Sequence, residues 1–174
     1  FFFQELFEIA NDSNITIVFC AGNCEVLVGL DPMKRDSTII SVSAIDRYNK
    51  RASFTNFGKQ STLSAPGVEI YSCKPGNDYV INDGTSMSSP IVAGVVGLMK
   101  SINPELTNTE IINILRKSGK QLDPSIGPLV QADKALELCL TGNYKQLNKL
   151  NKDSIKAEIR RLEKNIIKLK NLLK

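Results

Sequence analysis

In the first half of the chain, apolar residues have helical spacing near the N-terminus and form continuous runs after it. Near the N-terminus, four apolar side chains recur three or four positions apart and predict a helix with one apolar face: Phe3, Leu6, Phe7 and Ala10. After the polar break NDSN come three runs rich in apolar and β-branched residues, at 15–20, 37–46 and 67–73. Continuous apolar strands bounded by turns are typical of a parallel sheet covered on both faces. This half of the chain therefore predicts an α/β fold.

The segment 86–101 predicts a helix that is apolar on every side. Its hydrophobic side chains leave no polar face: Ile91, Val92, Ala93, Val95, Val96, Leu98 and Met99. A helix that is hydrophobic all round is expected to be buried. Gly94 and Gly97 weaken this helix but allow another backbone to approach it closely.

Two further helices are expected towards the C-terminus. The sequence TNTE is a capping box, in which the Thr107 hydroxyl accepts from the Glu110 amide and the Glu110 carboxylate reaches back. The helix that begins there continues to about Lys117. After the loop DPSIGP, the segment LVQADKALELCL predicts one more helix, which ends near Gly142.

Residues 144–174 are expected to form a region separate from residues 1–143. Apolar side chains there recur alternately four and three positions apart over almost three heptads: Ile155, Ile159, Leu162, Ile166, Leu169 and Leu173. The pattern favours a coiled coil, or a helix docked on another chain through 147–173, over an amphipathic helix folded back on the globular region. So short a coil is weak, and any association would need further contacts.

The charges divide at the same place. From Lys145 onward the chain has ten Lys and Arg residues and three Asp and Glu residues, a net charge of +7. Because the whole chain has a net charge of +4, residues 1–144 have a net charge of −3. A basic tail can bind nucleic acid or an acidic lipid surface. Beyond Tyr144, however, this tail has no aromatic side chain on which a base could stack. We therefore expect a protein partner and no nucleic acid. No apolar run approaches the ~20 residues that span a bilayer.

The four cysteines do not have the spacing of a metal site. They form no CxxC pair and the chain contains no histidine, so we expect no zinc site. Cys20 lies in an apolar strand and Cys139 on an apolar helix face, which predicts buried thiols. The sequence leaves the disulfide state of all four open: Cys20, Cys24, Cys73 and Cys139.

The sequence GTSMSSP places a serine where a nucleophile could act. Gly84 permits an unusual backbone angle before Ser86, and the helix that starts at Ser86 directs free amides and its dipole at that point. Pro90 lies in the first turns, where a missing amide hydrogen costs little. An ordinary Ser/Thr helix cap explains the same residues equally well.

The sequence VFCAGN ends a predicted buried strand with Gly22 and Asn23. A carboxamide at the C-terminal end of a parallel strand points into the crevice where α/β folds bind ligands. The Asn23 amide could therefore donate a hydrogen bond to a developing oxyanion. The alternative is a simple turn asparagine.

The segments AGN, ASFTNFG with LSAPGVEIYS, and GTSMSSP, which follow one another in that order along the chain, resemble the C-terminal half of the catalytic domain of subtilisin-like serine proteases, the subtilase family. GTSMSSP resembles the serine signature, AGN the strand end with the oxyanion asparagine, and ASFTNFG with LSAPGVEIYS the connecting strands. NPELTNTEIINIL resembles the helix after the serine helix. The resemblance covers about residues 1–140 and implies the C-terminal part of a doubly wound, mainly parallel sheet.

The resemblance also implies roles for individual residues. Ser86 corresponds to the nucleophile, and Asn23 to the side-chain donor of the oxyanion hole, with the Ser86 amide as its companion. Thr85 and Gly84 are expected to support that hole. One wall of the substrate pocket is expected at the strand end, where a cysteine departs from the small residues usual there: Cys20, Ala21 and Gly22.

The family's aspartate and histidine have no counterpart in this chain. It contains no histidine, and its aspartates occupy no matching position. Without a general base the serine is a poor nucleophile. We therefore expect this chain alone to be inactive, with Asp and His supplied by an upstream segment or a companion chain. The alternatives are a catalytically inactive structural or interaction module and, least favoured, an unrelated α/β protein.

Other expectations concern the chain as a whole. Phe1 is not expected to be a natural start, so the chain would be a processed product or part of a longer polypeptide. A polypeptide substrate follows from the family. No cofactor is evident, although calcium, frequent in the family, is possible. The compartment stays open, with secretion weakly favoured by the resemblance.

Overall fold

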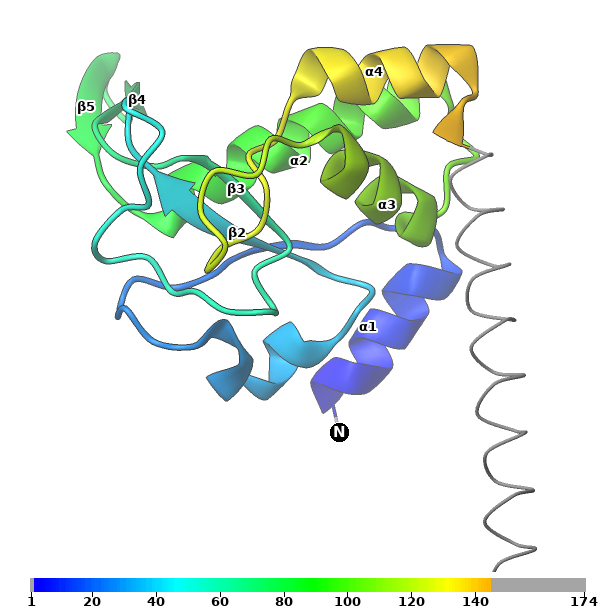
Figure 1. Cartoon of the computed structure of the whole chain (residues 1–174), viewed down its shortest axis with the longest axis horizontal. Coiled ribbons are helices and arrows are strands. Elements are labelled where there is room, and N and C mark those ends of the chain that lie inside the picture. Colours follow the sequence, from blue (N-terminus) through cyan, green and yellow to red (C-terminus); the bar gives the residue numbers. More distant parts are fainter. Residues whose placement is uncertain (1, 145–174) are drawn as a thin grey trace, which may run out of the picture.

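The computed structural model describes residues 2–144, so the expected heptad helix at 147–173 lies outside the described residues. The helices and strands along the chain are α1 (Phe2–Asp12), β1 (Val18–Cys20), β2 (Ile40–Ile45), β3 (Leu63–Pro66), β4 (Ile70–Lys74), β5 (Asp78–Asn82), α2 (Thr85–Ile102), α3 (Asn108–Ser118) and α4 (Ala132–Thr141) (Figure 1). Two short 3-10 helices, η1 (Val28–Leu30) and η2 (Pro32–Arg35), lie between β1 and β2. The predicted boundary at residue 143 stays a prediction.

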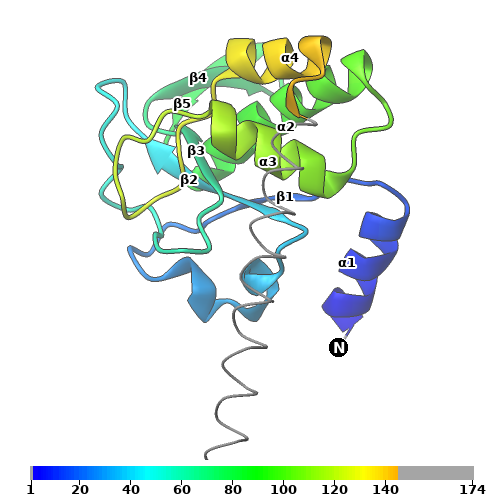
Figure 2. The same ribbon diagram turned by 45° about the vertical axis from the view of Figure 1, so that its right-hand side comes forward.

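Three parallel strands form the centre of the fold, in the order β1-β2-β3. Val42 in β2 lies opposite both Cys20 in β1 and Leu63 in β3. All of β2 is buried, whereas β1 at the edge is half-buried. Helices α2, α3 and α4 lie on one side of this sheet and α1 on the other (Figures 1 and 2). The predicted α/β fold with a parallel sheet is confirmed.

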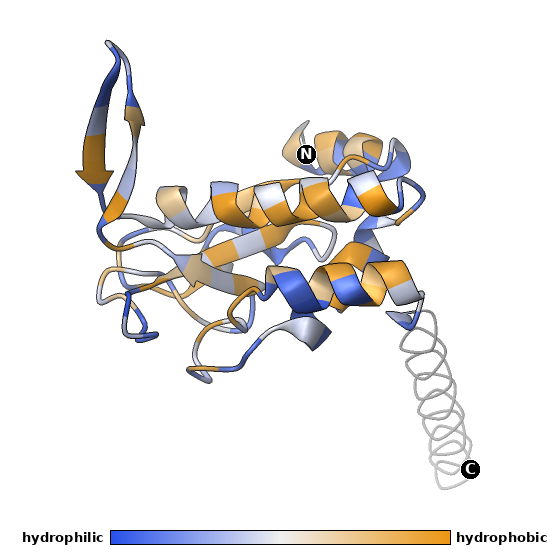
Figure 3. Ribbon diagram, turned by 90° about the horizontal axis from the view of Figure 1, so that it is seen from above, coloured by the Kyte–Doolittle hydropathy of each residue, from blue (hydrophilic) through white to orange (hydrophobic). Residues whose placement is uncertain are grey.

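The third parallel strand was expected at 67–73, and this expectation was wrong. The parallel strand is β3, whose first three residues are fully buried beside β2. The later run instead forms β4, which pairs antiparallel with β5 in a hairpin that projects from the body (Figure 3). Its apolar side chains are stabilised across the hairpin, as in the stacked rings of Tyr71 and Tyr79 with centroids 4.9 Å apart. The turn has positive φ at Gly76 and Asn77, of 92° and 57°.

Helix α2 packs on the sheet with one face only. Its buried apolar residues belong to one core with residues of the strands and of the two later helices: Val92, Val95, Val96 and Met99. The opposite face is open, because Ile91 and Leu98 are 36% and 51% exposed. The expectation of a helix buried on all sides is therefore wrong for residues 2–144, since nothing in this part of the chain covers the outer face of α2.

The predicted ends of two helices agree with the structure. In α3 the Thr107 side chain accepts from the Glu110 amide, and the Glu110 carboxylate accepts from the Thr107 amide, so the capping box is confirmed. Helix α4 ends before Gly142, whose φ is 66°. None of the helices in the described part of the chain is long and apolar enough to cross a membrane.

Helix α1 buries less of its apolar face than its sequence predicts. Phe7 is 3% exposed and its ring lies 6.0 Å from that of Phe19 on β1, and Ala10 is also buried. Phe3 and Leu6 are about half exposed, at 51% and 46%. The expected face of four residues is therefore only half covered by residues 2–144.

All four cysteines are free thiols. Cys139 is buried, as predicted, and burial raises the pKa of its thiol, which keeps it protonated and unreactive. Cys20 is only half-buried, because β1 lies at the edge of the sheet.

Candidate active site

The strand end after β1 and the start of α2 meet at the carboxyl end of the parallel sheet. The Thr85 amide and hydroxyl both donate to Asn23 Oδ1, at 2.9 and 2.8 Å. The Gly22 amide in turn donates to the Thr85 hydroxyl at 3.1 Å. Three residues that the sequence singled out are thus joined directly, although more than sixty positions separate the two segments.

These bonds fix the direction of the Asn23 amide group. Because two donors face Oδ1, the Nδ2 group is turned away from Thr85. The point at which a β-carbon on Gly84 would lie is 3.4 Å from Asn23 Nδ2, 3.0 Å from Ser86 Oγ and 3.7 Å from the Ser86 nitrogen. The expected nucleophile and both expected oxyanion donors therefore lie around one small region of space.

Gly84 keeps this region open. Its φ of 148° is in the range that side chains disfavour, and it precedes α2 without providing a side-chain cap. A methyl group there would occupy the space between Ser86 and Asn23. The glycine therefore serves both the backbone turn and the access to Ser86.

Ser86 lies in the first turn of α2 and is exposed. The helix runs for 18 residues, so its N-terminal amides and dipole favour negative charge beside Ser86. This is the field that an oxyanion requires. No histidine is available to Ser86 from this chain, because the sequence contains none.

Ser88 anchors the start of α2, and sequence reasoning did not single it out. It is fully buried, and its hydroxyl lies 3.1 Å from the carbonyl oxygens of both Ala65 and Pro66 at the end of β3. A β-carbon on Gly67 would overlap this hydroxyl. The paired small residues in SSP and APG are the only sequence signal of this contact.

The predicted substrate wall is formed mainly by backbone. Cys20 ends β1 and is half-buried, while the Ala21 side chain is fully buried and its amide donates to Val42 O at 2.9 Å. Gly22 has a φ of 109°, which favours glycine. The peptide groups of this segment, rather than large side chains, face the other site residues.

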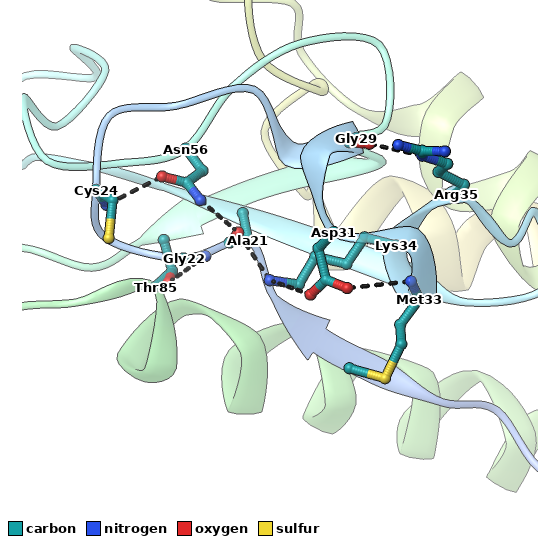
Figure 4. Close-up of polar contacts among 10 residues, drawn as sticks. All are labelled: Ala21, Gly22, Cys24, Gly29, Asp31, Met33, Lys34, Arg35, Asn56 and Thr85. Carbon is teal, nitrogen blue, oxygen red and sulfur yellow. Dashed lines mark hydrogen bonds and ion pairs between the residues drawn. The ribbon is translucent and has the colours of Figure 1, made fainter. Parts of the chain in front are cut away.

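Two residues that the sequence did not identify hold this segment (Figure 4). Lys34 Nζ donates to the Ala21 carbonyl at 3.0 Å and lies 3.4 Å from an Asp31 carboxylate oxygen. Asn56 Nδ2 donates to the same carbonyl at 3.1 Å. Asn56 belongs to the quoted segment ASFTNFG, but nothing in the spacing of that segment indicated where its side chain would point.

The described part of the chain contains no cluster of metal-binding side chains. No three His, Cys, Asp or Glu residues among residues 2–144 are grouped so that they could hold an ion. The expectation of possible calcium rests on the family alone and remains untested.

Comparison with known proteins identifies the sequence family. The family description "Subtilase family" matches residues 3–145. Over 131 residues the chain is 39% identical to a thermostable alkaline protease of Halalkalibacterium halodurans, covering 74% of this chain and 36% of that protein. Over 118 residues it is 39% identical to subtilisin DY of Bacillus licheniformis, covering 65% and 42%.

Solved structures share the fold. A protease of Pseudoalteromonas arctica matches with a TM-score of 0.73 and 26% identity, over 78% of this chain and 46% of that one. A cold adapted subtilisin-like serine proteinase matches with a TM-score of 0.66 and 26% identity, over 72% and 48%. The chain spans less than half the length of each of these four proteins.

Proposed function

The chain belongs to the subtilase family of serine proteases, and from this premise we propose that it supplies the nucleophile and the oxyanion hole of a subtilisin-type endopeptidase. The aspartate and histidine of that enzyme would come from an upstream segment or a companion chain. The observation that carries the proposal is the region of space bounded by Ser86 Oγ, Asn23 Nδ2 and the Ser86 amide.

The proposed reaction uses these atoms in turn. Ser86 Oγ attacks the carbonyl carbon of the scissile peptide bond and its proton passes to the histidine of the complementing segment. The carbonyl oxygen becomes an oxyanion that accepts hydrogen bonds from Asn23 Nδ2 and the Ser86 amide. Collapse of the tetrahedral species expels the amine, which takes the proton from the histidine, and water then releases the acyl group by the same route.

The histidine has to come from outside this sequence. In subtilisin, loss of the triad histidine slows turnover about 10⁶-fold. The chain alone would therefore have little more than the residual activity of its oxyanion hole. The site at Ser86 would therefore catalyse peptide hydrolysis only when another segment or chain supplies the histidine.

The uncovered face of α2 supports such complementation. This face consists of Ile91, Gly94 and Leu98, and both large side chains are substantially exposed. A β-carbon on Gly94 would meet nothing within 4 Å among the described residues. The edge strand β1 is likewise unpaired on its outer side within residues 2–144. Further polypeptide packed here would extend the sheet and bury this face.

A second reading, the catalytically inactive structural or interaction module, is favoured by one observation: 174 residues contain no histidine. In that reading the site geometry would be a relic. The heptad segment at 147–173, outside the described residues, would then serve assembly with another helix.

A fluorophosphonate probe distinguishes the two. We expect stoichiometric labelling of Ser86 in the complete protein as purified, located by peptide mass spectrometry, and none in Ser86→Ala. Ser101→Ala, on the same helix far from the site, should label like the parent protein. The enzyme proposal is wrong if saturating probe leaves Ser86 unmodified in folded material that includes every co-purifying fragment. Intact mass and N-terminal sequencing of that material identify the polypeptide that brings the histidine.

A further inference from the structure

The turn that carries Asn23 has an unfavourable backbone. Between β1 and η1 the chain reverses within a few residues, and both Gly22 and Glu25 have positive φ, of 109° and 54°. A glutamate in this region is strained, because its β-carbon crowds the backbone. Such a turn keeps one conformation only when surrounding contacts determine it.

Asn56 provides those contacts on both sides of Asn23. Its Oδ1 accepts from the amides of Cys24 and Val26, at 3.0 and 3.1 Å, and its Nδ2 donates to the Ala21 carbonyl. Its own backbone amide donates to the Gly22 carbonyl at 2.9 Å. Four backbone groups of the turn thus form hydrogen bonds with one residue. Figure 4 shows those of Cys24 and Ala21, with Lys34 sharing the Ala21 carbonyl.

Asn56 is itself held by the centre of the sheet. The residue is 8% exposed, and its carbonyl oxygen accepts from the Ser43 hydroxyl of β2 at 2.8 Å. That hydroxyl also lies 2.8 Å from the Ser61 hydroxyl. A β-carbon on Gly22 would overlap Asn56 Nδ2, so the glycine and the asparagine fit each other. The turn is therefore tied through Asn56 to the most buried strand.

Asn23 has a second support in Thr85, at the start of α2. Thr85 binds the side-chain oxygen of Asn23 and accepts from the Gly22 amide before it, whereas Asn56 binds backbone groups on both sides of Asn23. We propose that Asn56 is a positioning residue: through the turn 21–26 it sets the place of Asn23 Nδ2 relative to Ser86. This inference rests on the proposed function. Asn56 touches neither the substrate nor the reacting atoms.

A double-mutant cycle in the complete protein tests this role. The variants are Asn56→Ala, Asn23→Ala and the double variant, and the readouts are the rate constant for fluorophosphonate labelling of Ser86 and kcat for a peptide substrate. We expect Asn56→Ala to lower both about 10- to 100-fold, because a misplaced donor loses much of its effect. In the Asn23→Ala background the same substitution should change them less than about threefold, because the donor that it positions is gone.

Asn108 offers a matched control for lost stability. It is 3% exposed on α3, accepts from the Thr16 hydroxyl at 2.6 Å, and donates to Asn11 Oδ1 and Ile15 O at 3.2 and 3.0 Å. Asn108→Ala should lower the Tm by a similar amount and leave the labelling rate unchanged below the transition. If Asn56→Ala does not fold, Asn56→Asp replaces it. Its carboxylate still accepts from the Cys24 and Val26 amides, but it sets an acceptor oxygen against the Ala21 carbonyl in place of the donor.

The outcomes separate the two proposals. If the parent protein fails to label at Ser86, the proposed function is wrong whatever the Asn56 variants do. If the parent labels and Asn56→Ala labels at the same rate, the positioning role is wrong and the proposed function stands. Equal losses from Asn56→Ala with and without Asn23 would also overturn the positioning role, since they would indicate a general structural effect.

Discussion

At the scale of single residues, the site depends on side chains that are small or missing. Gly84 leaves open the space that Ser86 and Asn23 face, and Gly22 leaves room for the Asn56 amide. Both glycines also have a positive φ that larger residues disfavour. The missing β-carbons of these two glycines therefore matter for the arrangement of Asn23, Asn56 and Ser86 as much as the side chains of those residues do.

Gly84→Ala is expected to abolish reaction at Ser86 while leaving the fold intact. The added methyl would lie 3.0 Å from Ser86 Oγ and 3.4 Å from Asn23 Nδ2, between the proposed nucleophile and the proposed oxyanion donor. We expect the labelling rate of the complete protein to fall more than about 100-fold, the effect of losing an oxyanion donor. Gly76→Ala is the control, because its φ of 92° imposes similar strain but its β-carbon meets nothing within 4 Å. Equal labelling of the two variants would contradict this role of Gly84.

At the scale of elements, local signals define the ends of helices well and the partners of strands poorly. The capping box of α3 and the glycine after α4 act through neighbouring residues only, and both were predicted. The strand at 70–74 was assigned to the wrong sheet, because β-branched composition does not distinguish a buried parallel strand from an exposed hairpin. The sequence PGN at its tip was the available turn signal.

Thr107→Ala should cost about 1 kcal/mol in the free energy of unfolding, since it removes the side-chain cap of α3. Urea denaturation followed by circular dichroism measures this. Thr109→Ala is the control, an exposed position within the first turn of the same helix. A loss for Thr109→Ala as large as for Thr107→Ala would show that the cap is not the cause.

The loop before α4 should give the protein part of its sensitivity to acid. Hydrogen bonds from the Ser125 hydroxyl and amide, at 2.6 and 2.7 Å, hold the pKa of Asp123 below its usual value of 3.8. A carboxyl with a lowered pKa stabilises the fold above its unfolded pKa, and this stability is lost as the pH falls through the folded pKa.

Asp123→Asn keeps an acceptor for Ser125 but cannot be protonated in this range. Its stability should therefore fall less than that of the parent between about pH 6 and about pH 3, as measured by urea denaturation. Asp123→Ala, which lacks the acceptor, should already be less stable at the higher pH. If Asp123→Asn loses as much stability in acid as the parent, Asp123 is not the responsible group.

At the scale of the whole molecule, residues 2–144 match only part of their relatives and leave one apolar face uncovered. The chain covers less than half of each subtilase relative compared above, and α2 presents an apolar face that nothing in this part of the chain covers. In the proposed complete enzyme that face becomes interior. The stability of the whole should then depend on residues that are exposed in this structure.

Leu98→Glu tests that dependence. In the complete protein we expect it to lower the free energy of unfolding by about 2 kcal/mol or more, because a charge would be buried without a partner. Leu140→Glu on α4 is the control; Leu140 is 71% exposed, against 51% for Leu98, and does not belong to the uncovered face of α2. If both variants unfold at the same denaturant concentration as the parent, Leu98 remains exposed in the complete protein.

The sequence by itself determined the class of fold, the ends of α3 and α4, and the segments that carry Ser86 and Asn23. These follow from spacings and motifs within about a dozen residues, over which backbone geometry and capping act. The sequence also showed that these 174 residues contain no histidine, so that none of them can lie beside Ser86 as a histidine base.

Only the tertiary structure decided which strand continues the sheet, which face of α2 is covered, and how the site is held. Asn56 and Ser88 reach backbone groups more than twenty positions away, and no local pattern encodes such contacts. Hydrogen bonds to a turn depend on the directions of side chains in space, and these are set when the elements pack. The segments of the site could be read from the sequence, but the residues that hold Asn23 facing Ser86 could not.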